Sequence, residues 1–170
     1  THHDFGRAFS CACQRDADDN QLLARLHRFS NMGMLAAVSF ENSESDGLAA
    51  TVEGRARFVS AFAAAKTYAE NPAGTLLLSG GSGTGKTHLA AAVANHLMAR
   101  GEPVFFAFVP DLLDHLRSSY GPENGLTYDE LFEQVKSIPA LVLDDLGNHS
   151  GTPWAEEKLY QVLNHRYLTG

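Results

Sequence analysis

The stretch of sequence that decides the fold is Gly80-Gly81-Ser82-Gly83-Thr84-Gly85-Lys86-Thr87. Its glycines carry no Cβ, so consecutive backbone N–H groups can converge on the oxygens of a phosphate. An apolar run at 75–79 precedes it, and a helical pattern at 85–100 follows it. A buried strand, a glycine-rich turn and a helix in this order predict a phosphate-binding loop.

Three residues at the end of the loop have expected roles. Lys86 reaches the β- and γ-phosphates of a nucleotide, and the Thr87 hydroxyl is a ligand for Mg²⁺. The N-terminus of the following helix adds a partial positive charge near the phosphates. His88 comes next in the chain and is grouped with the nucleotide-binding residues, in a packing or supporting role. The loop therefore predicts binding of ATP or ADP with Mg²⁺.

An acidic element follows further along the chain. Leu141-Val142-Leu143 is apolar and predicts a buried strand that ends in Asp144 and Asp145. In open α/β sheets, ligands bind in the crevice outside the carboxyl ends of the strands. We therefore expect Asp144 to hold Mg²⁺, directly or through water, and Asp145 to orient or deprotonate the attacking water.

Strands alternate with helices along the chain, which predicts an α/β fold with a parallel sheet. The expected strands are 75–79, 104–109 and 140–144. Two helices are expected at 52–70 and 85–100, and two more begin at Pro110 and Pro153. A further helix is capped by Thr127 and Glu130 and ends before Pro139. The inward residues expected on the last helix are Leu159, Val162 and Leu163. A short run at 36–40 resembles a strand inside a linker.

Composition excludes several classes of protein. The 170 residues are 44% hydrophobic and 19% charged, which is typical of a globular chain. The longest apolar runs are too short to cross a membrane. The net charge is −7, and residues 101–170 carry four Lys/Arg against eleven Asp/Glu. This balance excludes a strongly basic nucleic-acid module. Without a secretory signal pattern or a disulfide framework, a cytoplasmic location is expected.

Residues 1–33 form a separate N-terminal segment in our division of the chain, and 34–170 form the main domain. Cys11 and Cys13 lie in that segment. They are either part of a zinc site, which needs four ligands, or two reduced thiols in a loop. Arg117 and Arg166 are expected on exposed helix faces, and the alternative is contact with a neighbouring subunit's nucleotide or with single-stranded DNA.

The chain resembles a known family through several segments together. These are the phosphate loop continued as Lys86-Thr87-His88-Leu89-Ala90, Val109-Pro110-Asp111-Leu112-Leu113, Asp144-Asp145-Leu146-Gly147 and Phe40-Glu41-Asn42. Over roughly residues 34–170 it is similar to the DnaC/DnaI-type bacterial helicase loaders and the related IstB transposition ATPases, which are AAA+ proteins. In this resemblance, Phe40-Glu41-Asn42 enters the ATPase domain near the adenine, and Cys11-x-Cys13 is similar to the end of a zinc-binding N-terminal region.

The resemblance implies an AAA+ P-loop NTPase that acts in DNA replication as a helicase loader. Such proteins bind ATP, self-associate, contact single-stranded DNA as an assembled oligomer, and place the replicative DNA helicase on DNA. Asp145 stands where many AAA+ proteins have glutamate, which implies slow hydrolysis that depends on assembly. An IstB-like transposition ATPase and a nucleotide-dependent scaffold without turnover remain alternatives. A small-molecule kinase would need an arginine-rich lid, and none is visible.

The resemblance also sets an expectation for strand order. Relatives continue past the third strand with a strand that carries a polar sensor residue and a helix that carries an arginine finger, and neither is recognisable before Gly170. The chain is therefore expected to be truncated before the sensor strand. That strand lies between 75–79 and 140–144 in the family, so these two segments should not pair directly. Direct pairing would favour the kinase-type arrangement.

Overall fold

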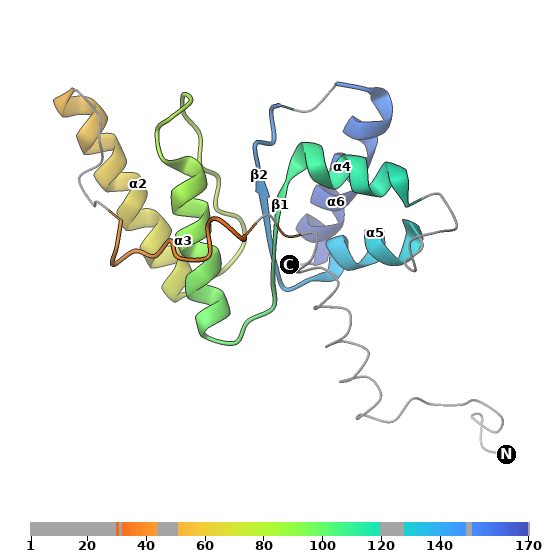
Figure 1. Ribbon diagram of the computed structural model, residues 1–170, viewed down its shortest axis with the longest axis horizontal. Coiled ribbons are helices and arrows are strands. Elements are labelled where there is room, and N and C mark those ends of the chain that lie inside the picture. Colours follow the sequence, from red (N-terminus) through yellow and green to blue (C-terminus); the bar gives the residue numbers. More distant parts are fainter. Residues whose placement is uncertain (1–29, 31, 44–50, 120–127, 149–150, 170) are drawn as a thin grey trace, which may run out of the picture.

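Helices precede, separate and follow two strands in the computed structural model, which describes residues 30, 32–43, 51–119, 128–148 and 151–169. The elements in chain order are α2 (Val52–Glu70), α3 (Lys86–Ala99), β1 (Val104–Phe108), α4 (Val109–Ser118), α5 (Tyr128–Ser137), β2 (Ala140–Asp144) and α6 (Pro153–Thr169). The sheet forms the middle layer, with α2 and α3 on one side and α4, α5 and α6 on the other (Figure 1). The predicted α/β class is confirmed.

The sheet consists of β1 and β2, which pair in parallel. The register runs from Val104 opposite Ala140 to Phe108 opposite Asp144. Both strands therefore end at the same edge, and Asp144 lies at that edge. The loop that leads into α3 lies at the same end of the molecule (Figure 1).

Side chains of β1 alternate between two hydrophobic clusters because successive residues of a strand point to opposite faces. Val104 and Phe106 pack with α2 and α3, whereas Phe105 and Ala107 pack with α4, α5 and α6. Both Phe105 and Phe106 are almost completely buried. Both faces of β1 are therefore covered by helices, as its continuous apolar sequence predicts.

The predicted strand at 75–79 is not formed, which corrects our expectation of three strands. The segment has no regular secondary structure and belongs to no sheet. Leu76 and Leu78 pack against the cluster around α3, while Leu77 is 77% exposed. A strand needs a neighbour that satisfies its backbone hydrogen bonds, and β1 and β2 pair with each other instead. The segment 75–79 does not pair with β2, which is what the family's strand order led us to expect.

Other expectations need smaller corrections. Residues 36–40 are not a strand, since turns run through 32–37 and Phe40 is buried against the core. Val109 begins α4 rather than ending β1. Leu163 is 45% exposed, so only Leu159 and Val162 of the three expected residues on α6 are buried. The Thr127 cap lies outside the described residues.

The boundary between 1–33 and 34–170 stays a prediction. Near that boundary, the Ser30 hydroxyl donates to the carbonyl of Phe106 at 3.1 Å. Met32 is 8% exposed and belongs to the cluster of α2 and α3. The residues just before the boundary therefore contact the main domain directly.

Candidate functional site

The glycine-rich loop owes its shape to three backbone conformations that L side chains rarely adopt. Gly80, Gly83 and Gly85 have φ values of 152°, 75° and 86°. Gly85 is the residue immediately before α3, and no side chain caps that helix end. The first N–H groups of α3 have no partner within the helix, so they can bind an anion.

Two side chains of the loop region donate hydrogen bonds to the same backbone carbonyl. The Lys86 ammonium donates to the Gly81 carbonyl oxygen at 2.7 Å, and the Thr84 hydroxyl donates to the same oxygen at 2.9 Å. Lys86 therefore lies over the loop, and its contact with the β- and γ-phosphates stays a prediction. A phosphate oxygen would give its ammonium a negatively charged acceptor in place of a neutral carbonyl, which adds the attraction between two opposite charges.

The loop and the acidic strand end meet at Thr87 and Asp144. The Thr87 hydroxyl donates to Asp144 Oδ2 at 2.8 Å, across 57 positions of sequence. Thr87 lies in the first turn of α3, and Asp144 is the last residue of β2, with 9% of its surface exposed. A hydroxyl and a carboxylate side by side fit Mg²⁺, which prefers hard oxygen ligands.

Asp145 has a different environment from Asp144. It is exposed, and its φ is 58°. Among the described residues, every other residue with positive φ is a glycine. Asn148 Nδ2 donates to Asp145 Oδ2 at 3.0 Å, and the Asn148 N–H donates to the Asp145 carbonyl. Aspartate tolerates this left-handed conformation better than most residues. Its carboxylate is therefore held at the strand edge and open to solvent.

The segment 39–43 is fixed beside α3. Just before this segment, the carbonyls of Leu35 and Val38 accept hydrogen bonds from Asn95 Nδ2 of α3, at 2.8 and 2.7 Å. Phe40 lies edge-on to His96, with ring centroids 6.2 Å apart. Bonds from the backbone at Glu41 and from the Ser39 side chain lower the pKa of the Glu41 carboxyl. The chain before and within this segment thus packs against α3, on the side of the sheet that carries the glycine-rich loop.

Three further predicted residues lie elsewhere. His88 is exposed on the first turn of α3, so it does not pack in the core, and its supporting role beside the nucleotide-binding residues stays a prediction. Arg117 is exposed as expected, 3.8 Å from Asp114 and 5.0 Å from the Trp154 ring. Arg166 differs, because it is half-buried and donates to three carbonyls at the end of α5, at 2.6 to 3.1 Å. Its burial lowers the pKa of the guanidinium. Arg166 therefore has a structural role.

Sequence reasoning missed two residues that touch the site. A Cβ built on Gly85 would lie 2.8 Å from Phe58 Cε2, so the ring packs directly against the loop. The spacing of Phe58 and Phe62 places both on the inner face of α2, but nothing in it indicates which loop they meet. Asn148 bonds Asp145 as described above, and the polar turn after the strand is the signal that could have found it.

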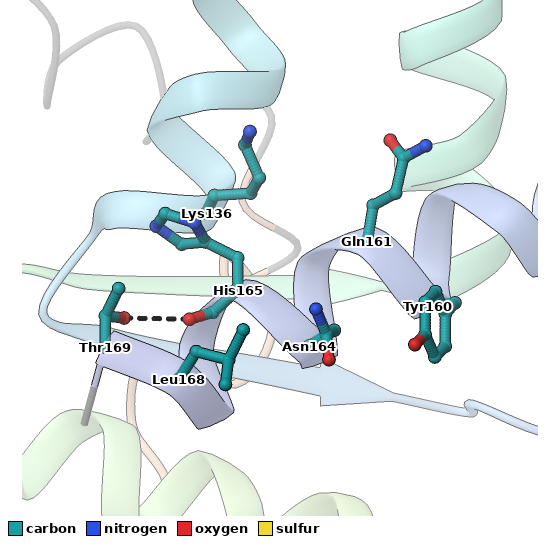
Figure 2. A pocket seen from close by; sticks show the side chains of 7 residues that line it. All are labelled: Lys136, Tyr160, Gln161, Asn164, His165, Leu168 and Thr169. Atoms are coloured by element: carbon teal, nitrogen blue, oxygen red, sulfur yellow. Dashed lines mark hydrogen bonds between the residues drawn. The ribbon is translucent and has the colours of Figure 1, made fainter.

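A cavity of about 400 Å³ lies on the outer face of α6 and contains none of the predicted site residues. Six of its lining residues come from α6 and Lys136 comes from α5 (Figure 2). The Lys136 ammonium is already paired with Glu133 at 2.6 Å. This cavity offers neither a glycine-rich loop nor a carboxylate at a strand end, so the candidate site remains at the loop and Asp144.

The described residues contain no cluster of three metal-binding side chains. Cys11 and Cys13 lie outside the described ranges, so the zinc expectation stays untested.

Within the part of the chain that the structure describes, no helix is long and apolar enough to cross a membrane.

Comparison with known proteins places this site in a family. Residues 14–170 match the model of the IstB-like ATP binding protein family. The replicative helicase loader DnaI of Bacillus subtilis is 37% identical over 103 residues, which cover 59% of this chain and 32% of that protein. The loader DnaC of Escherichia coli K12 is 28% identical over 111 residues, covering 64% of this chain and 45% of that protein.

A DnaC from Buchnera aphidicola (strain Bp) is 29% identical over 106 residues, covering 61% of this chain and 43% of that protein. The matched region spans half or less of each of these relatives. The family match extends over most of the chain and includes both the glycine-rich loop and Asp144. The chain therefore belongs to the IstB-like ATP-binding protein family of AAA+ P-loop proteins.

Proposed function

We propose that this chain binds ATP or ADP with Mg²⁺ at residues 80–87 and Asp144. The observation that carries the proposal is the 2.8 Å bond between the Thr87 hydroxyl and Asp144. A glycine-rich turn alone has many uses. A hydroxyl in the first helical turn that meets a strand-end carboxylate is the arrangement that a nucleotide-bound Mg²⁺ requires.

Each side chain has a separate part in this proposal. The backbone N–H groups from Gly81 to Thr87 bind phosphate oxygens, and Lys86 balances the charge of the β- and γ-phosphates. Thr87 and Asp144 hold Mg²⁺, which neutralises the charge that develops on the phosphates. Asp145 is exposed one residue further on, where its carboxylate can orient a water molecule or accept its proton.

The proposed reaction is slow hydrolysis of ATP to ADP and phosphate. Aspartate is one methylene shorter than the glutamate of many AAA+ proteins, so Asp145 reaches less far toward the water. We propose that turnover depends on self-association, since a neighbouring subunit supplies an arginine in the AAA+ proteins that this chain resembles. Slow turnover is suited to a switch rather than to a processive motor.

Nucleotide binding is tested by titration calorimetry with Mg-ADP. We expect Lys86→Ala to weaken binding about 100-fold or more, while Lys158→Ala, which removes a lysine from α6, leaves the affinity unchanged. Both variants should keep the circular dichroism of the wild-type chain. Equal affinities of Lys86→Ala and wild type would refute the proposed site.

The proposed biological role is that of a replicative helicase loader that acts in the cytoplasm. Its support is that the named relatives DnaC and DnaI are replicative helicase loaders. The proposed partners are the replicative DNA helicase, further copies of this chain, and single-stranded DNA contacted by the assembled oligomer. A complex with the purified helicase of the source organism, formed with ATP and lost with Lys86→Ala, would support this role.

An IstB-like transposition ATPase is a second candidate, favoured by the description of the matching family itself. The site chemistry is shared, so only the partner separates the two. Binding to a transposase and not to the helicase would establish this alternative. A scaffold without turnover would bind ATP and release no phosphate, with or without single-stranded DNA.

A further inference from the structure

The ring of Phe58 packs against the residue that joins the phosphate loop to α3. Phe58 belongs to α2, whereas Gly85 immediately precedes α3, so the contact links two elements of one layer. A Cβ on Gly85 would lie 2.8, 3.6 and 3.8 Å from three atoms of this ring. These are its three nearest atoms, and all belong to Phe58. The ring therefore occupies the space directly beside the Gly85 Cα.

The position of the ring is fixed by the packing of α2. Ala65 and Ala69 have no exposed surface, so α2 approaches its neighbours closely through small side chains. Phe62, one turn after Phe58, lies 6.3 Å from its ring and 5.5 Å from the ring of Phe40. The loop thus rests on a row of aromatic rings that belongs to the core.

Gly85 needs such a support because a glycine backbone has a wider choice of conformations than that of any other residue. Glycine adopts left-handed and right-handed backbone conformations with similar ease, and at φ = 86° no side chain holds it. Its carbonyl accepts the Leu89 N–H at 2.9 Å, which is the first helical bond of α3. A shift at Gly85 would therefore move the start of α3 and redirect the amide of Lys86.

We propose that Phe58 is a positioning residue of the phosphate loop, which holds Gly85 so that the amides at the start of α3 point at the bound phosphate. The inference rests on the proposed nucleotide binding and adds a residue that the loop motif does not contain. Binding sites gain affinity when their groups are held in the bound geometry before the ligand arrives. A misplacement of about 1 Å can cost about 100-fold in function.

The test compares Phe58→Ala with Phe62→Ala. Both variants remove an aromatic ring from the same face of α2, and only Phe58 touches Gly85. The first measurement is the affinity for Mg-ADP. We expect Phe58→Ala to weaken it about tenfold or more. Phe62→Ala should change it by less than about threefold, and Phe58→Leu, which refills the space, should recover most of the loss.

The second measurement uses the nucleotide-free protein. Hydrogen exchange at the Leu89 amide reports the bond to Gly85, and exchange at Val93 in the same helix reports general loosening of α3. We expect the Leu89 to Val93 rate ratio to rise about tenfold in Phe58→Ala, to rise less in Phe58→Leu, and to stay constant in Phe62→Ala. A purely structural role of Phe58 would change both amides together and leave the ratio constant.

The outcomes separate this inference from the proposed function. Equal effects of Phe58→Ala and Phe62→Ala on affinity and on the exchange ratio would overturn the inference while leaving nucleotide binding intact. A wild-type chain that binds no Mg-ADP would refute the proposed function. The exchange ratio would then decide whether Phe58 holds Gly85, because that measurement needs no nucleotide.

Discussion

The bond between Thr87 and Asp144 gives a prediction that can be measured without nucleotide. Thr87→Val replaces the hydroxyl by a methyl group of nearly the same size and leaves the helix unchanged otherwise. The carboxylate of Asp144, 9% exposed, then loses a donor at 2.8 Å. Hydrogen bonds to charged groups contribute about 1.5–3 kcal/mol, so we expect the free energy of unfolding to fall by about 2 kcal/mol.

Urea unfolding followed by fluorescence measures this loss. Trp154 is the only tryptophan of the chain, and it packs half-buried beside β2 and α4. With a slope of about 2 kcal/mol per molar urea, a loss of about 2 kcal/mol lowers the midpoint by about 1 M. Thr87→Ser keeps the hydroxyl and serves as the control, with a much smaller shift.

A double-mutant cycle with Asp144→Asn isolates the pair. If the bond carries the effect, the two variants should be non-additive by about 1–2 kcal/mol. Additivity within about 0.3 kcal/mol would mean that the hydroxyl and the carboxylate do not interact in solution, and the reasoning from their proximity would be refuted. Thr87 and Asp144 would then not be expected to share one Mg²⁺.

Other substitutions test separate parts of the structure. Asp145→Asn should leave Mg-ADP affinity unchanged and suppress phosphate release, and a turnover rate equal to that of wild type would contradict the role of Asp145. Phe106→Ala removes a fully buried ring and should lower the free energy of unfolding by about 3–5 kcal/mol, measured by urea titration. Arg166→Met should destabilise the chain by about 1–3 kcal/mol because three carbonyls at the end of α5 lose their donor, and an unchanged midpoint would show that water replaces it. The pKa of Glu41 is lowered on folding, so its contribution to stability is present above the carboxyl's ordinary pKa and is lost as the pH falls through the lower value. Side-chain NMR titration of Glu41 near pH 3–5 would show the lowered pKa, and urea unfolding over the same pH range should show this loss in the wild-type chain and not in Glu41→Gln.

Much of the site could be predicted because its requirements are local. Glycines at 83 and 85 are needed where φ is positive, and Lys86 and Thr87 must follow them at the start of a helix. The apolar run before Asp144 likewise predicts a strand with a carboxylate at its end. These signals depend on backbone stereochemistry and on the period of each element, and both are written in the sequence over a few residues.

Contacts between distant segments were decided only by the tertiary structure. The apolar run at 75–79 has the composition of a strand, yet it pairs with neither β1 nor β2, because a ladder depends on a partner from elsewhere in the chain. In the sequence, Arg166 cannot be told from an exposed helix arginine. Only the fold brings it to the carbonyls at the end of α5. The contact of Phe58 with Gly85 follows from how closely α2 and α3 approach. Each of these depends on long-range packing, which no local pattern in the sequence encodes.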